Sequence, residues 1–297
     1  MLNGIIIKGI SGFYYVEVEN SLYECKARGI FRKNKITPLV GDKVSISIVN
    51  EEEKKGIIEE IHPRKTELVR PPIANIDKVF ITFSVKEPSP NYLLLDRFIV
   101  FSEKEELEIV IVVSKSDLDT DEVSKYIEDT YGKIGYKVIS VSNETGKNMD
   151  ILKDEMRDCI SVFAGQSGVG KSSIINYLDP SINLETNEIS KKLGRGRHTT
   201  RHAQIHKIEG DILIADTPGF SSFELKNIEL EELGEYFIEF RNHDECRFGS
   251  KCIHKNEPGC GVKKAVEEGE ISHKRYENYL QILDEINNLK GKLKRNI

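Results

Sequence analysis

Residues 160–173 read ISVFAGQSGVGKSS, a short run rich in β-branched residues followed by a glycine-rich turn. The turn fits the pattern G-x4-G-K-[ST], in which backbone N–H groups wrap phosphates, the lysine reaches the β and γ oxygens and the hydroxyl ligates Mg²⁺. A glycine loop that merely turns the chain is the competing interpretation. The strand before it and the helix after it favour a phosphate loop, formed by Gly165, Gln166, Ser167, Gly168, Val169, Gly170, Lys171, Ser172 and Ser173.

Short apolar runs alternate with helical stretches around this motif, which is typical of a parallel α/β sheet. Residues 203–208 and 211–215 are separated only by Glu209-Gly210, so we expect an antiparallel hairpin at one edge of the sheet. The other strands are expected at 78–85, 108–113, 137–141 and 160–164, and the helices at 92–103, 120–132, 149–157 and 171–178.

The first 65 residues show a different pattern, in which apolar and polar positions alternate between glycine turns. Short strands at close spacing predict a small β-barrel, which either binds a ligand or only packs. Residues 26–35 carry five cations and Phe31 but no acid. We expect this segment to be a loop that either meets RNA phosphates, with aromatic reinforcement, or is simply solvated.

Composition limits the class of protein. The 297 residues are 38% apolar and 31% charged, which predicts about two domains, or three if one is small. Lys plus Arg number 43 and Asp plus Glu 49, and this net charge of −6 excludes a generally basic nucleic-acid coat but not local basic patches. No apolar run approaches the roughly 18 to 20 residues that cross a bilayer, and residues 1–12 lack signal-peptide features. We therefore expect a soluble cytoplasmic protein with no membrane partner.

A second motif, DTPG at residues 216–219, follows an expected strand and so lies at the carboxyl edge of the sheet. There Asp216 could hold Mg²⁺ through water, and the N–H of Gly219 could sense the γ-phosphate. Its position about 45 residues after the phosphate loop supports this interpretation.

The Gly- and Arg-rich residues 194–201 lie between these two motifs in the sequence. Either Thr199 or Thr200 could close on Mg²⁺ and the γ-phosphate in the triphosphate state, with Thr200 slightly better placed to begin the next strand. A solvated basic loop is the alternative.

Residues 114–117 read SKSD after an expected strand and resemble the guanine-reading motif N-K-x-D. A carboxylate at Asp117 accepts hydrogen bonds from N1–H and the 2-amino group of guanine, donors that adenine lacks, while the stem of Lys115 covers the base. Ser114 stands where asparagine is expected, so its shorter side chain could lose a tether to the phosphate loop and lower nucleotide affinity. Asn143 stands where alanine is common. The expected base site comprises Ser114, Lys115, Ser116, Asp117, Ser142 and Asn143.

The order of the motifs is unusual, because the base motif precedes the phosphate loop, whereas an ordinary GTPase meets its phosphate loop first. The sequence therefore predicts a circularly permuted domain. Its join would run through residues 149–157 into the strand at 160–164, which is feasible because domain termini are often close together. Since the chain leaves this domain directly after residues 216–219, we expect a shift there to pull on the C-terminal part.

Three cysteines and a histidine crowd into residues 246–260 as C-x5-C-x-H-x5-C. In a reducing compartment such a cluster suggests a metal rather than disulfides. Three thiolates and one imidazole complete a tetrahedral Zn²⁺ site with no open position, so the ion should be structural; free buried cysteines are the alternative. Surrounding basic residues suit RNA or, alternatively, a protein partner. The expected ligands are Cys246, Cys252, His254 and Cys260.

These motifs in this order, with RHTTR at 197–201 and the CRF and EPGC surroundings of the cysteines, resemble the bacterial ribosome small-subunit-dependent GTPase A family over nearly the whole chain. The resemblance implies an OB-fold barrel at 1–65, a circularly permuted α/β P-loop GTPase domain at 66–222 and a helical zinc-binding domain at 223–297. It implies ribosome-stimulated hydrolysis of GTP to GDP and phosphate, with Mg²⁺ and one structural Zn²⁺. Its partners would be the small ribosomal subunit, near its decoding region and late in maturation, and its rRNA; we expect a monomer.

The resemblance also bears on how water is activated. A Ras-like switch has glutamine directly after its glycine, but Phe220 occupies that position here. The resemblance implies that His198 positions or deprotonates the water, as imidazole can; RNA contact or solvation is the alternative. Two other functions stay open: an RNA-binding assembly factor whose hydrolysis only times release, and a P-loop ATPase or kinase, which Asp117 disfavours.

Overall fold

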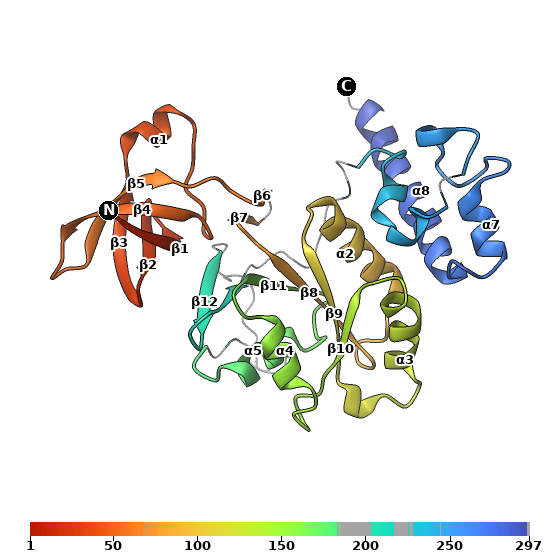
Figure 1. Cartoon of the computed structure of the whole chain (residues 1–297), viewed down its shortest axis with the longest axis horizontal. Coiled ribbons are helices and arrows are strands. Elements are labelled where there is room, and N and C mark those ends of the chain that lie inside the picture. Colours follow the sequence, from red (N-terminus) through yellow and green to blue (C-terminus); the bar gives the residue numbers. More distant parts are fainter. Residues whose placement is uncertain are drawn as a thin grey trace.

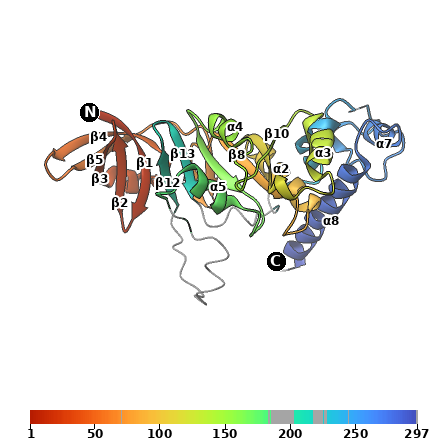
Figure 2. The same cartoon turned by 90° about the horizontal axis from the view of Figure 1, so that it is seen from below.

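The computed structural model describes residues 1–69, 71–182, 184, 203–216, 225, 228–243 and 245–295. The chain forms an elongated molecule with a β-barrel at one end, a sheet with helices in the middle and a helical module at the other end (Figure 1). A second view shows the same succession along the long axis (Figure 2). Within the described residues, no helix combines the length and the apolar composition that crossing a bilayer needs.

The barrel is a five-stranded sheet closed on itself. Its strands are hydrogen-bonded in the order β1-β2-β3-β5-β4, and pairing between β1 and β4 closes the ring. Because alternate side chains point inward, Ile6, Val16, Cys25, Ile46 and Ile58 fill the interior. The predicted barrel, with the strand number of an OB-fold, is confirmed. The strands are β1 (Leu2–Ile10), β2 (Phe13–Val18), β3 (Ser21–Ala27), β4 (Lys43–Asn50) and β5 (Lys55–Ile61).

Residues 26–35 differ from the predicted loop. Lys26 lies in β3, and Gly29–Lys33 form the short helix α1. Phe31 turns inward from this helix and is only 8% exposed, because it packs into the core beneath the strands. The cations of the segment stay exposed, but the expectation that Phe31 could reinforce an RNA contact is wrong.

The central domain contains a six-stranded sheet in the order β10-β9-β8-β11-β13-β12. All pairs are parallel except β12 with β13, which pair antiparallel from Ile208 opposite Ile212 to Gln204 opposite Asp216. This confirms both the parallel sheet and the predicted hairpin. The strands are β8 (Lys78–Ser84), β9 (Glu108–Ser114), β10 (Lys137–Ser140), β11 (Ile160–Ala164), β12 (Gln204–Ile208) and β13 (Ile212–Asp216).

Helices cover both faces of this sheet. On one face, α2 (Tyr92–Lys104) and α3 (Val123–Ile127), which continues as a π-helical turn, pack on strand residues such as Ile111. On the other, α4 (Met149–Glu155) and α5 (Lys171–Leu178) pack on Phe80, Val110 and Val112. Since neighbouring strand residues face opposite sides, the sheet is buried on both faces.

Two connections join the barrel to the central domain. A short hairpin of β6 (Glu67–Val69) and β7 (Pro72–Ala74) follows the barrel in the chain, so the boundary expected at residue 65 lies between β5 and β6. In addition, β1 pairs with β12 at Lys8 opposite Gln204, which makes the barrel and the central sheet one continuous eleven-stranded sheet (Figure 2).

The C-terminal module packs against α2 through buried charges. Arg275 donates to Asp96 of α2 at 2.5 Å and to Glu239 at 2.7 and 2.9 Å, and all three side chains are buried. Asn278 donates to the second oxygen of Asp96 at 2.6 Å. The boundary expected at 222 lies outside the described residues. The module contains α7 (Gly261–Glu267), α8 (His273–Arg295) and 3₁₀ turns at Leu233–Tyr236, Ile238–Phe240 and Gly249–Lys251.

Candidate nucleotide and metal sites

The phosphate loop connects the end of β11 to the start of α5, as the motif requires. Gly165, Gly168 and Gly170 have φ values of +136°, +86° and +97°, a region that favours glycine. Space also demands glycine at the first position, since a Cβ on Gly165 would lie 2.3 Å from the carbonyl oxygen of Thr82 in β8. The loop therefore turns tightly over the strand ends, where backbone N–H groups can approach a phosphate at the helix N-terminus.

The ammonium of Lys171 turns back onto its own loop. It donates to the carbonyl oxygens of Gly165 at 2.7 Å and Gln166 at 2.9 Å. Burial lowers the pKa of Lys171 to about 8, and no acid among the described residues pairs with it. A partly buried cation without a counter-charge is costly, so this site suits an anion such as a phosphate group.

The base motif is tied directly to the phosphate loop. Ser114 lies at the end of β9, is buried, and its hydroxyl is 2.6 Å from the carbonyl oxygen of Val169 and 3.3 Å from that of Phe83. Lys115 donates to the carbonyl oxygen of Gly168 at 3.1 Å. The expectation that the shorter serine side chain would lose the tether is therefore wrong, because β9 ends close enough to the loop for a hydroxyl to reach it.

Asp117 faces a pocket between the base motif and α5. Its Oδ1 accepts a 2.5 Å hydrogen bond from the buried hydroxyl of Ser142. Its Oδ2 accepts no hydrogen bond from a described residue and is therefore open to a ligand. The pocket brings together residues of both motifs and of the loop after β10, as predicted. It is also lined by Leu118, Glu144 and Ile174, which directly follow motif residues but carry no signal of their own. The predicted residues that line it are Ser114, Lys115, Asp117, Asn143, Gly170 and Ser173.

Asp216 ends β13 next to the phosphate loop. β13 runs parallel to β11, with Ala215 opposite Val162, so Asp216 lies at the edge of the sheet where the loop begins. Reduced contact with water raises the pKa of its carboxyl group, a shift that a bound cation would oppose. Among the described residues, Asp216 and Ser172, which lies in the first turn of α5, are suited to hold a Mg²⁺ ion beside bound phosphates.

The other residues predicted to take part in hydrolysis are His198, Thr199, Thr200 and Gly219. They lie outside the described residues, so their roles stay predictions.

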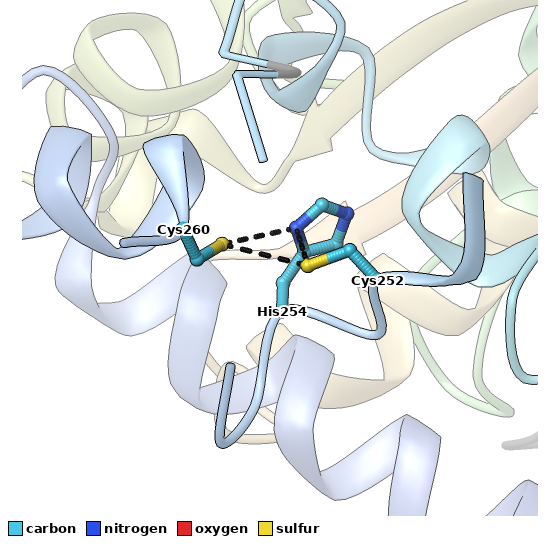
Figure 3. Close-up of side chains that lie close together, drawn as sticks. All are labelled: Cys252, His254 and Cys260. Carbon is cyan, nitrogen blue, oxygen red and sulfur yellow. Dashed lines mark hydrogen bonds between the residues drawn. The ribbon is translucent and has the colours of Figure 1, made fainter. Parts of the chain in front are cut away.

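Three of the four predicted metal ligands lie together in the C-terminal module (Figure 3). The Sγ atoms of Cys252 and Cys260 are 3.8 Å apart, and the Nδ1 atom of His254 is 3.5 and 3.3 Å from them. Tetrahedral zinc with Zn–S bonds of about 2.3 Å and a Zn–N bond of about 2.0 Å separates two sulfurs by roughly 3.8 Å and sulfur from nitrogen by roughly 3.5 Å. The residues present thus fit Zn²⁺.

Cys246 stands slightly apart from this group. Its sulfur is not within the cluster of mutually close ligand atoms, yet it contacts Cys252. Burial raises the pKa of Cys252 to about 12, and a hydrogen bond with the Cys246 side chain adds to this shift. A cation would favour the thiolate forms instead, so Cys246 stays the predicted fourth ligand.

The surroundings of His254 favour a metal ligand. Burial lowers its pKa, which keeps the imidazole neutral as ligation requires. Phe240 and Tyr279 pack edge-on against the ring, and a Cβ on Gly234 would lie 2.9 Å from Nε2. The ring is therefore held with Nδ1 toward the two thiols.

The chain is similar to known proteins in both sequence and fold. The family model described as RsgA GTPase matches residues 61–226, and that described as RsgA N-terminal domain matches residues 3–58. A protein of Alkaliphilus metalliredigens named small ribosomal subunit biogenesis GTPase RsgA is 47% identical over 287 residues, which cover 96% of this chain and 98% of that protein. A protein of the same name from Geobacillus sp. is 50% identical over 291 residues, which cover 96% and 98%.

Solved structures agree with the sequence matches. YjeQ from Thermotoga maritima superposes with a TM-score of 0.84 at 38% identity, over 96% of this chain and 98% of that one. YloQ, described as a circularly permuted GTPase, gives a TM-score of 0.81 at 40% identity, over 97% and 96%. The permuted order predicted from the motifs is thereby confirmed.

Proposed function

The chain belongs to the RsgA GTPase family, and we propose that it hydrolyses GTP to GDP and phosphate while assisting late maturation of the small ribosomal subunit. The observation that carries the proposal is that a phosphate loop and a guanine-type motif meet at one pocket. There Ser114 of the guanine-type motif donates a hydrogen bond to Val169 of the phosphate loop. We also propose a monomer that works in the cytoplasm.

The nucleotide would be held at both ends by the residues just described. The ammonium of Lys171 would leave its loop carbonyls for the β and γ oxygens, and backbone N–H groups of the loop would bind the same phosphates. At the other end, Asp117 would accept two hydrogen bonds from guanine while Ser142 holds its Oδ1. Mg²⁺, when bound at Ser172 and Asp216, would neutralise the charge that develops on the phosphates.

Hydrolysis requires a water molecule to attack the γ-phosphorus while the bond to the GDP oxygen breaks. Phe220 cannot orient this water as glutamine does. We therefore assign that role to His198, an imidazole able to position water or accept its proton. Without an added partner the reaction should be slow, roughly 10⁻⁴ to 10⁻³ s⁻¹ as at an unassisted Ras-type site.

The small subunit would complete the site. The exposed cations of residues 26–35 lie on the barrel, and the cysteine-rich module lies at the opposite end of the molecule (Figure 1). A partner that grips both ends could convert binding energy into catalytic geometry between them. Contacts between these cations and rRNA phosphates would make the binding sensitive to salt.

Single-turnover hydrolysis with and without purified small subunits tests this function, with GTP and ATP compared in each condition. We expect the subunits to accelerate the hydrolysis of GTP, but not that of ATP, by orders of magnitude. Added salt should suppress this acceleration. The Asp117→Asn variant should lose selectivity for guanine, because a site built for donors that adenine lacks can discriminate by on the order of 10⁴. Equal rates with and without subunits, or equal binding of ATP and GTP, would contradict the proposal.

The His198→Ala variant tests the water-activating role separately. It should lose most of the subunit-stimulated rate with little change in GDP affinity, because the imidazole acts on water rather than on the nucleotide. Full stimulation of this variant would leave the function intact and remove His198 from it.

A further inference from the structure

An exposed aromatic side chain projects from the cysteine-rich turn. Residues 247–251 are all exposed, and Phe248 keeps 48% of its surface accessible, more than any other phenylalanine among the described residues. By contrast, Phe237 and Phe240 of the same module stack on each other inside its core. Exposing a phenylalanine forgoes its burial energy, and the exposed ring is free to meet a partner.

Two cations, Arg247 and Lys251, lie close to Phe248 in the sequence. Arg247 and Lys251 make no side-chain hydrogen bond or ion pair with any other described residue. Other cations of the module are paired, namely Arg241 with Glu103, Lys255 with Asp284, Lys264 with Glu268 and Lys274 with Glu277. Within the described part of the molecule, no ion pair therefore neutralises the charges of Arg247 and Lys251.

The turn that carries these side chains is ordered by its own backbone. The N–H of Gly249 donates to Cys246 at 3.1 Å, that of Lys251 to Phe248 at 3.1 Å and that of Cys252 to Gly249 at 3.0 Å. The turn also ends at two predicted metal ligands, Cys246 and Cys252. Little conformational entropy would be lost when a partner binds such a surface.

We infer that Arg247, Phe248 and Lys251 form a stacking platform for an unpaired base of the small-subunit rRNA. This inference rests on the proposed function and names the contact that the C-terminal module makes. An exposed ring with one cation before it and one after it in the chain, neither paired with a described residue, matches a nucleotide, whose base stacks on the ring while the neighbouring phosphates meet the charges. Of the two kinds of partner, a nucleic acid offers both a flat base for the ring and phosphates for the two cations.

Four single variants of the full-length, zinc-loaded protein test the platform by their affinity for small subunits at fixed salt. Phe248→Ala and Phe248→Leu should bind about tenfold more weakly or worse, because neither offers a ring face, whereas Phe248→Tyr should bind normally. Ile151→Ala is the matched control, since Ile151 is similarly exposed on α4 of the central domain and should bind normally. Basal GTP hydrolysis and zinc content should be unchanged in all four.

A photo-crosslinking side chain at position 248 identifies what lies against the ring. Crosslinks to rRNA are expected, and Arg247→Ala should lower the slope of log affinity against log salt by about one. Normal binding of subunits by Phe248→Ala would overturn the inference. It would also be overturned if Phe248→Ala lost binding, Phe248→Leu kept it and the crosslinks went to a ribosomal protein. Failure of the unsubstituted protein to bind subunits would overturn the proposed function, and this contact with it.

Discussion

Replacing Ser114 with alanine tests whether the base motif holds the phosphate loop in its binding conformation. The hydroxyl of Ser114 donates to the carbonyl oxygen of Val169 at 2.6 Å in a buried position. Alanine removes this donor without adding bulk, so the substitution isolates the bond. We expect weaker binding of GDP, because the loop loses a restraint that it has before the nucleotide arrives.

The size of the effect follows from the burial of the acceptor. Leaving a buried carbonyl without its donor costs about 1–3 kcal/mol, which corresponds to about 5-fold to 150-fold in affinity if the whole cost falls on binding. Because the bond to Val169 already exists in the nucleotide-free protein, part of the cost appears as reduced folding stability instead. We therefore expect the lower part of this range, about 5-fold to 10-fold.

The assay is a calorimetric titration of GDP into each protein, with Ser116→Ala as the comparison. The hydroxyl of Ser116 is buried in the same motif but has no hydrogen-bond partner among the described residues, so its removal should change affinity less than about twofold. Ser114→Asn, which restores the usual residue, should bind at least as well as the original protein. Equal affinities for the two alanine variants would refute the reasoning.

Three further predictions concern charge and metal. Burial lowers the pKa of Lys171 to about 8, so GDP affinity should fall as pH rises through 8, and binding at pH 8.5 should take up protons; titrations in two buffers with different ionisation heats would contradict this if they gave no uptake. Cys252→Ser should lose zinc and subunit binding but not GDP binding, because structural zinc contributes folding free energy on the order of 10 kcal/mol; metal analysis checks this, and Cys159→Ser should keep its zinc. Asp96→Asn should lower the free energy of unfolding by about 3–5 kcal/mol, because it breaks the buried pair with Arg275; a loss below 1 kcal/mol in urea titrations would contradict it.

The sheet could be predicted from sequence because its strands are buried on both faces and read as continuous apolar runs. The barrel gave a weaker signal, since each of its strands buries only alternate residues. β3 gives a weak signal, because the exposed apolar Leu22 interrupts the alternation that Tyr23 and Cys25 would otherwise display. The expectation for Phe31 was wrong for a related reason. Its cationic neighbours predict an exposed side chain, whereas the short helix α1 turns it inward and buries it.

At the candidate sites, residue types were predictable and distances were not. The pattern gives the length of the Ser114 side chain but not how near β9 ends to Val169, and that distance decides whether the tether forms. Likewise, Asp96 and Arg275 are 179 positions apart, and no local pattern connects them. Long-range pairs of this kind depend on how domains pack, which a single sequence does not encode in any short motif.

The two ends of the molecule are attached to the central domain by different kinds of contact. Arg275, at 1% exposure, is locked between Asp96 and Glu239, so moving the C-terminal module away from α2 would expose or orphan buried charges. The barrel instead meets the central sheet through the Lys8–Gln204 pair, an ion pair of Lys207 with Glu17 and a shared hydrophobic cluster that includes Ile6 and Ile205. These buried ion pairs oppose the movement of the C-terminal module that the order of the motifs predicts when residues 216–219 shift. A partner that displaces the barrel would therefore act on β12, its neighbour in the sheet, and β12 belongs to the hairpin whose two ends lead into residues 185–202 and 217–224.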